Sequence, residues 1–229
     1  MPSHHPRVDD LRPQAVAFDL DGLLVNTEEL YQDVGTELLR RRGREFTADL
    51  LDRMMGRPQQ VALQIMIDCH GLSDTIETLA AETRAIFVSL LDTRLAPMPG
   101  AVELLDALAA AGIPRGVATS SGPEFASDVL GRLGLLGRFA FVLTAADVVQ
   151  GKPHPEIYLT AARRLAVPPE RMLVLEDSHN GCRAGVAAGA VVVAVPGGHS
   201  HRHGFAGARF IASSLADARI AAELGLGSC

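Results

Sequence analysis

The feature of this sequence that most restricts its fold is a series of short apolar runs separated by segments with helical spacing. Strands that alternate with helices predict βαβ units and a parallel sheet buried on both faces. One run, AVAF, lies near the start at 15–18. The others lie in the second half, at 116–119, 139–144, 171–177, 190–195 and 208–213. Segments rich in Ala and Leu lie between them, at 101–112, 124–134 and 155–167.

No such apolar run occurs between about residues 27 and 96, where the pattern is helical throughout. Asn26 and Glu29 have the spacing of a helix N-cap and its capping-box partner. The 229 residues suit an ordinary domain with a smaller one inserted. We therefore predict an α/β fold with a Rossmann-like, three-layer parallel sheet core formed by 11–27 and 96–229. An α-helical domain at 28–95 is inserted after its first strand.

Composition and charge disfavour several classes of partner. The net charge of −6, from 21 basic and 27 acidic residues, argues against nucleic acid or an anionic membrane. The absence of Trp and the presence of only two Tyr argue against a surface that stacks nucleobases. Neither an apolar signal segment nor a membrane-spanning run is found, and the three cysteines match neither a zinc motif nor a disulfide framework. These observations predict a cytoplasmic protein, do not disfavour a small anionic substrate, and leave the oligomeric state open.

Polar side chains follow four of the predicted strands at the point where each strand ends. In a parallel sheet, ligands bind beyond the carboxyl ends of the strands, so we expect these groups to meet at one edge. In chain order they are Asp19 and Asp21, then Thr119, Ser120 and Ser121, then Lys152, and finally Glu176 and Asp177.

The residue types at this edge suit a metal and a phosphate. Mg²⁺ prefers oxygen ligands, so Asp19 and Asp177 could share one and relieve the repulsion between carboxylates. Lys152 adds a positive charge, and a charge pair at about 4 Å contributes about 4 kcal/mol at an effective dielectric constant of about 20. Hydroxyl and N–H groups at 119–121 could hold phosphate oxygens. Taken one by one, the same groups could instead be solvated turns, helix caps or a surface lysine.

Four motifs resemble those of the haloacid dehalogenase-like hydrolase superfamily: DLDGLL, VATSS, GKP and LVLEDS. The helical segment lies where one branch of that superfamily carries a small cap domain. This branch includes β-phosphoglucomutase and small sugar-phosphate and pseudouridine-phosphate phosphatases. The resemblance implies a Mg²⁺-dependent enzyme that transfers a phosphoryl group.

The resemblance also implies a role for each matching position. Asp19 would be the nucleophile that forms an aspartyl-phosphate. Asp21 would be the general acid and then the general base, and its backbone carbonyl would bind Mg²⁺. Lys152 would bridge the phosphate and Asp19. Asp177 would be a metal ligand, with Glu176 a direct or water-mediated one.

The same family pattern assigns phosphate binding to Thr119, Ser120 and Ser121. In the cap domain, Tyr31 and Arg57 are candidate substrate contacts, the latter within the stretch 55–58. The mutase relatives carry a histidine at the position of Tyr31, so tyrosine there favours a phosphatase.

We therefore predict a Mg²⁺-dependent phosphomonoesterase acting on a small phosphorylated metabolite through an aspartyl-phosphate. Two alternatives remain: a phosphomutase of the β-phosphoglucomutase type, and a non-catalytic phospho-aspartate switch module. His199, His201 and His203 alternate after Pro196, and either a solvated loop or a second metal site fits them.

Overall fold

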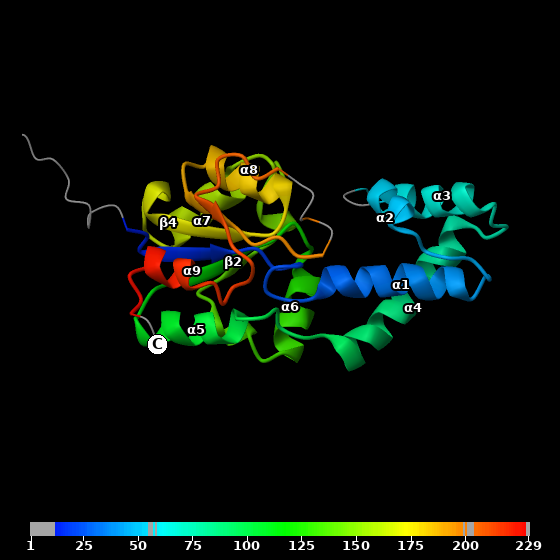
Figure 1. Cartoon of the computed structure of the whole chain (residues 1–229), viewed down its shortest axis with the longest axis horizontal. Helices are drawn as coiled ribbons and strands as arrows, with labels where there is room; N and C mark the ends of the chain where they lie inside the picture. The colour runs from blue at the N-terminus through cyan, green and yellow to red at the C-terminus, as the bar shows by residue number, and fades with distance from the viewer. Residues whose placement is uncertain (1–11, 55–56, 58, 199, 201–203, 228–229) are drawn as a thin grey trace, which may run out of the picture. The chain divides into compact units, whose positions relative to one another are not determined.

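The computed structural model describes residues 12–54, 57, 59–198, 200 and 204–227, which divide into two compact units. One unit holds the described residues up to Asn26 and from Ala96 onward, and the other is Thr27–Leu95. Both are drawn in Figure 1. None of the helices in the described part of the chain is long and apolar enough to cross a membrane.

The first unit is built on a sheet of six strands in the order β3-β2-β1-β4-β5-β6. Every neighbouring pair is parallel, which confirms the predicted α/β fold. Strand β1 lies in the middle of the sheet, where all its residues are buried. The strands are β1 Ala15–Phe18, β2 Arg115–Ala118, β3 Val142–Leu143, β4 Met172–Glu176, β5 Val191–Ala194 and β6 Phe210–Ile211.

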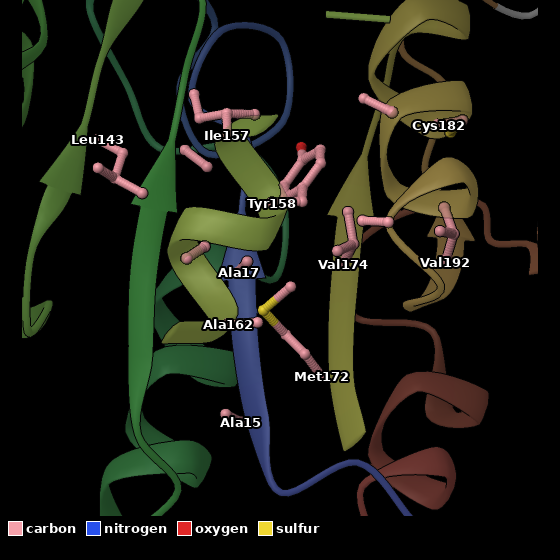
Figure 2. Close-up of a cluster of buried hydrophobic side chains, with 14 of the residues drawn as sticks. Ala15, Ala17, Leu143, Ile157, Tyr158, Ala162, Met172, Val174, Cys182 and Val192 are labelled. Atoms are coloured by element: carbon pink, nitrogen blue, oxygen red, sulfur yellow. The ribbon is translucent and has the colours of Figure 1, made fainter. Parts of the chain in front are cut away.

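Helices cover both faces of this sheet. Helices α7 and α8 lie on one side of it, and α5 lies on the other (Figure 1). Figure 2 shows the layer beneath α7 and α8, where Ala17 and Val174 of the sheet pack against Tyr158 and Cys182. The helices of this unit are α5 Ala101–Ala110, α6 Pro123–Arg132, α7 Glu156–Arg164, α8 His179–Ala187 and α9 Ala218–Glu223. The 3₁₀ turns that lie wholly within the described residues include η2 Leu136–Arg138, η3 Ala145–Asp147 and η4 Pro169–Arg171.

Two predicted strands are much shorter than the apolar runs that suggested them. The run at 139–144 contributes only β3, and the run at 208–213 contributes only β6. Both strands lie at the edges of the sheet and pair on one side only. Phe139 and Phe141 serve packing instead, the first edge-on to Phe18 and the second beside Gly116.

The second unit consists of four helices, α1 Thr27–Arg40, α2 Ala48–Met54, α3 Gln59–His70 and α4 Ile76–Arg94. Its apolar core includes Leu38, Leu63 and Leu79, all almost fully buried. Arg42 joins its segments through two hydrogen bonds to Asp74, of 2.7 and 2.9 Å.

The chain leaves and re-enters the sheet-containing unit at a single point. The Asn26 N–H donates to the Ala96 carbonyl at 3.1 Å, and the Asn26 side-chain oxygen accepts from the Ala96 N–H at 2.9 Å. Next to them, Val25 and Pro97 form an antiparallel bridge. Asn26, which the sequence predicts as a helix cap, ties together residues that are 70 positions apart.

Candidate active site

Lys152 is the centre of a buried cluster at the carboxyl ends of the strands. Its ammonium group donates to Asp19 Oδ1 at 2.5 Å, to Glu176 Oε1 at 2.6 Å and to the Ala118 carbonyl at 2.9 Å. The Lys152 side chain is only 4% exposed. These contacts come from β1, β2 and β4, because parallel strands end at the same edge of the sheet.

Three carboxylates gather beside this lysine. Oxygens of Asp19, Glu176 and Asp177 lie within 4.8 Å of one another, and all three residues are buried. One ammonium cannot balance three ionised carboxylates in a site that excludes water. An all-oxygen donor set with an excess of negative charge fits a hard divalent cation such as Mg²⁺.

The pKa values in the cluster follow from burial and charge. Burial raises the pKa of the Asp19 carboxyl, Lys152 opposes that rise, and the charges of Glu176 and Asp21 add to it. Burial alone would lower the pKa of Lys152, but the charges of Asp19 and Glu176 raise it above its ordinary value. Lys152 is therefore a fixed positive charge, and Asp19 depends on nearby cations to stay ionised.

A second group forms around Asp21. Its Oδ2 accepts hydrogen bonds from the Ser121 hydroxyl at 2.6 Å and from the Thr119 hydroxyl at 3.2 Å. The Ser121 N–H in turn donates to the Thr119 hydroxyl at 3.0 Å. Ser120, between them, is exposed. The structure thus brings three residues of the first and second motifs together.

Tyr158 is a member of the cluster that the sequence analysis missed. It lies on α7, and its hydroxyl points toward the carboxyl ends of the strands (Figure 2). The hydroxyl donates to Glu176 Oε1 at 2.6 Å. Burial, followed by the Glu176 charge, raises the pKa of Tyr158 well above its ordinary value. The one signal in the sequence was a tyrosine in an otherwise apolar stripe, since a buried tyrosine hydroxyl usually finds a partner.

The two predicted cap contacts belong to the helical unit. The Tyr31 ring stacks on Phe87 with centroids 4.4 Å apart, and its residue is 52% exposed. Arg57 is exposed, and its Nε donates to the Arg53 carbonyl at 2.9 Å. The rest of the stretch 55–58 and the three histidines at 199, 201 and 203 lie outside the described residues.

A pocket of about 140 Å³ lies apart from the charged cluster. Apolar side chains such as Leu23, Met98 and Leu215 line it, and Ser213 and Ser214 contribute hydroxyls. None of the described residues that line it carries a charged side chain. This pocket does not suit a phosphate, which needs positive charge, so we place the chemistry at Lys152 and the carboxylates.

Comparisons with known proteins identify the family to which this chain is similar. The family model described as haloacid dehalogenase-like hydrolase matches residues 13–189. The "Phosphorylated carbohydrates phosphatase" of Thermotoga maritima is 35% identical over 180 residues, or 77% of this chain and 82% of the relative. The "Validoxylamine A 7'-phosphate phosphatase" of Streptomyces hygroscopicus is 35% identical over 183 residues, or 80% and 85%. A crystal structure of a HAD family hydrolase from Deinococcus radiodurans R1, with bound phosphate and sodium, has a TM-score of 0.80 and 32% identity. It covers 95% of this chain and 98% of that one.

The chain belongs to the haloacid dehalogenase-like hydrolase family, as its four motifs predicted. Within that family it is an enzyme of the phosphatase type, a phosphoric monoester hydrolase. This confirms the predicted enzyme class and removes the alternative of a non-catalytic switch module.

Proposed function

We propose that this phosphatase is a Mg²⁺-dependent phosphomonoesterase that hydrolyses a small phosphorylated metabolite, a sugar phosphate or a related compound. The observation that carries the proposal is the contact of 2.5 Å between Lys152 Nζ and Asp19 Oδ1, beside the buried Asp177. A carboxylate and a phosphate monoester repel each other, so attack requires fixed positive charge at the site. A lysine pinned against the nucleophile supplies such charge.

The first half of the proposed reaction transfers the phosphoryl group to Asp19. Because Lys152 contacts Oδ1, we assign the attack on phosphorus to Oδ2. The bond from phosphorus to the leaving oxygen breaks as the bond to Oδ2 forms. Asp21 gives its proton to the leaving oxygen, so the alcohol departs neutral.

The second half hydrolyses the aspartyl-phosphate. Asp21, now ionised, takes a proton from water as the water oxygen attacks phosphorus. The bond between phosphorus and Asp19 Oδ2 breaks, which restores the carboxylate and frees inorganic phosphate. Lys152 stays on Oδ1 throughout and balances the charge on Asp19.

Asp19 and Asp177 are the residues that we propose to hold Mg²⁺, with the Asp21 carbonyl beside them. The bound cation would supply positive charge to the phosphate oxygens during transfer. The Thr119 hydroxyl and the Ser120 and Ser121 groups are proposed to orient the same phosphate. In the helical unit, Tyr31 and Arg57 remain candidates for contact with the rest of the substrate.

The test is release of inorganic phosphate from a panel of sugar phosphates, nucleotides, phosphoglycolate and an aryl phosphate, with Mg²⁺ and with a chelator. We expect turnover with Mg²⁺ only. Asp19→Asn keeps the shape of the side chain but removes the nucleophile, so it should lower kcat by about 10⁴-fold or more.

Asp128→Asn is the matched control, because Asp128 is an exposed residue that pairs with Arg132 on α6. It should leave kcat unchanged. Normal turnover by Asp19→Asn would contradict the assigned nucleophile. Formation of an isomer rather than phosphate, when a sugar phosphate is supplied with a bisphosphate activator, would instead favour the mutase alternative.

A further inference from the structure

The Glu176 carboxylate accepts four hydrogen bonds, about as many as it has lone pairs to offer. Oε1 accepts from Lys152 Nζ and from the Tyr158 hydroxyl, each at 2.6 Å. Oε2 accepts from the Ser178 N–H at 3.2 Å and from the Ser178 hydroxyl at 2.9 Å. A carboxylate offers about four lone pairs to donors. Four donors therefore occupy Glu176 before any cation approaches.

The surroundings of Glu176 hold it in this arrangement. Its side chain is 0% exposed, and Tyr158 is 0% exposed as well. The Ser178 hydroxyl is itself fixed, because it accepts from the Gly181 N–H at 3.0 Å as the N-cap of α8. To ligate a metal, Glu176 would have to give up one of these buried hydrogen bonds, which is costly where water cannot replace it.

We propose that Tyr158 and Glu176 act together as a buried support that positions Lys152 against Asp19, and that Glu176 is not a direct metal ligand. The support fixes the lysine from two sides. Glu176 accepts one of its N–H donors, and the Tyr158 ring lies under the ammonium, 5.0 Å from the nitrogen to the ring centroid. The other donors then point to Asp19 and to the Ala118 carbonyl. Of the buried acidic triad, Asp19 and Asp177 remain to bind the cation. This inference rests on the proposed function.

The first measurement is a titration with Mn²⁺ in the absence of substrate, in which electron paramagnetic resonance detects binding of the ion. Glu176→Gln and Asp177→Asn each remove one negative charge from the same cluster, so their long-range electrostatic losses are matched. We expect Asp177→Asn to weaken Mn²⁺ at least about 10-fold more than Glu176→Gln does, because only the former removes a direct ligand. Equal losses, or a larger loss for Glu176→Gln, would overturn the inference.

The second measurement is steady-state kinetics of Tyr158→Phe, which removes the hydroxyl but keeps the ring. Loss of an outer support of this kind typically costs about 10- to 100-fold in activity. We expect kcat of Tyr158→Phe to fall by this factor, while its KM and its affinity for Mn²⁺ stay close to those of the wild-type protein. Ile157→Val is the control for a merely structural effect, because Ile157 is a buried neighbour in the same helix and core cluster. It should lower the thermal midpoint without lowering kcat.

A kcat within twofold of the unchanged protein for Tyr158→Phe would contradict the positioning role. The Mn²⁺ titration requires no turnover, so it separates the two proposals. Absence of phosphate release from every compound would defeat the proposed function and leave the titration to decide this inference. A protein that binds no Mn²⁺ but releases phosphate would overturn the metal assignment alone.

Discussion

At the scale of single residues, the site depends on charges that are fixed before a substrate arrives. Lys152 is buried with three hydrogen-bond acceptors, so its ammonium does not have to reorganise when a phosphate binds. Asp19 gains the same benefit, since Lys152 already holds its Oδ1, and the proposed attack is assigned to its other oxygen. This arrangement brings several negatively charged carboxylates close together. Tyr158 and Ser178 offset part of the resulting repulsion by donating hydrogen bonds to Glu176.

Asp217 is a carboxylate near the surface that hydrogen bonds also hold in place. Its pKa gives a prediction about how the stability of the protein depends on pH. It caps α9 by accepting from the Arg219 N–H at 3.0 Å, and a hydrogen bond from the Arg219 side chain lowers the pKa of Asp217 to about 2. Because the folded pKa lies below the ordinary value of 3.8, the ionised form stabilises the protein above about pH 4. That contribution is lost as the pH falls toward 2.

Two substitutions separate the charge of Asp217 from its capping. Asn is as good an N-cap as Asp, so Asp217→Asn should lower the free energy of unfolding by about 0.5 kcal/mol at pH 7. It should cause no loss near pH 2. Asp217→Ala should cost about 1 kcal/mol at neutral pH, because it removes the cap as well. Urea denaturation at the two pH values measures both, and an effect of Asp217→Asn that is equal at pH 7 and pH 2 would contradict the assignment.

At the scale of secondary structure, the sequence is most informative where an element is central. Strands β1, β4 and β5 fall within predicted runs and β2 begins one residue before its run, because a strand buried on both faces is largely apolar. The predicted lengths of β3 and β6 were wrong, since each of these edge strands pairs with only two residues of its single neighbour although its apolar run is longer. Helix α2 lies within the segment 28–95 that was predicted to be helical, but the charged stretch 40–45 before it hides its start.

The residues of the candidate site also fall into those that the sequence predicts and those that it does not. Carboxylates and a lysine at the ends of apolar strands are informative, because such charged groups are rarely placed there without a partner. Tyr158 could not be recognised, since its helical spacing is that of an ordinary core residue. The sequence predicts that Ser121 and Asp21 lie at the same edge of the sheet, but only the fold shows the hydrogen bond between these residues, which are 100 positions apart in the chain.

The first turn of α8 gives a prediction about how closely this element packs on the site. A Cβ at Gly181 would lie 1.7 Å from Glu176 Oε1, so Gly181→Ala requires the carboxylate to move and to lose buried hydrogen bonds. We expect the free energy of unfolding to fall by about 2–4 kcal/mol. Gly131→Ala on α6 is the control, because nothing lies within 4 Å of its added Cβ. It should be neutral or stabilise the fold by up to about 1 kcal/mol. The midpoints of urea denaturation compare the Gly181→Ala and Gly131→Ala variants. Equal midpoints would show that Glu176 can move at little cost in free energy.

At the scale of the whole molecule, every residue that we assign to the chemistry belongs to one of the two units. Asp19, Asp21, Lys152, Glu176 and Asp177 all lie in the unit that carries the sheet. The helical unit has a buried core of its own, with Leu38, Leu63 and Leu79 among its members. Chemistry and metal binding should therefore depend on the first unit, while residues of the second remain free to differ with the substrate.

This division predicts that residues 27–95 can be removed without loss of the metal site. Asn26 and Ala96 exchange two hydrogen bonds next to the antiparallel bridge of Val25 and Pro97, so the two ends already have the geometry of a hairpin. A two-residue Asn-Gly turn suits such a connection. We expect the shortened protein to unfold cooperatively by circular dichroism and to bind Mn²⁺ with unchanged affinity. The same deletion carrying Asp177→Asn is the control and should not bind the ion. A shortened chain that folds but has lost Mn²⁺ would mean that the helical unit contributes to the metal site, and one that does not fold would mean that the sheet unit requires it for stability.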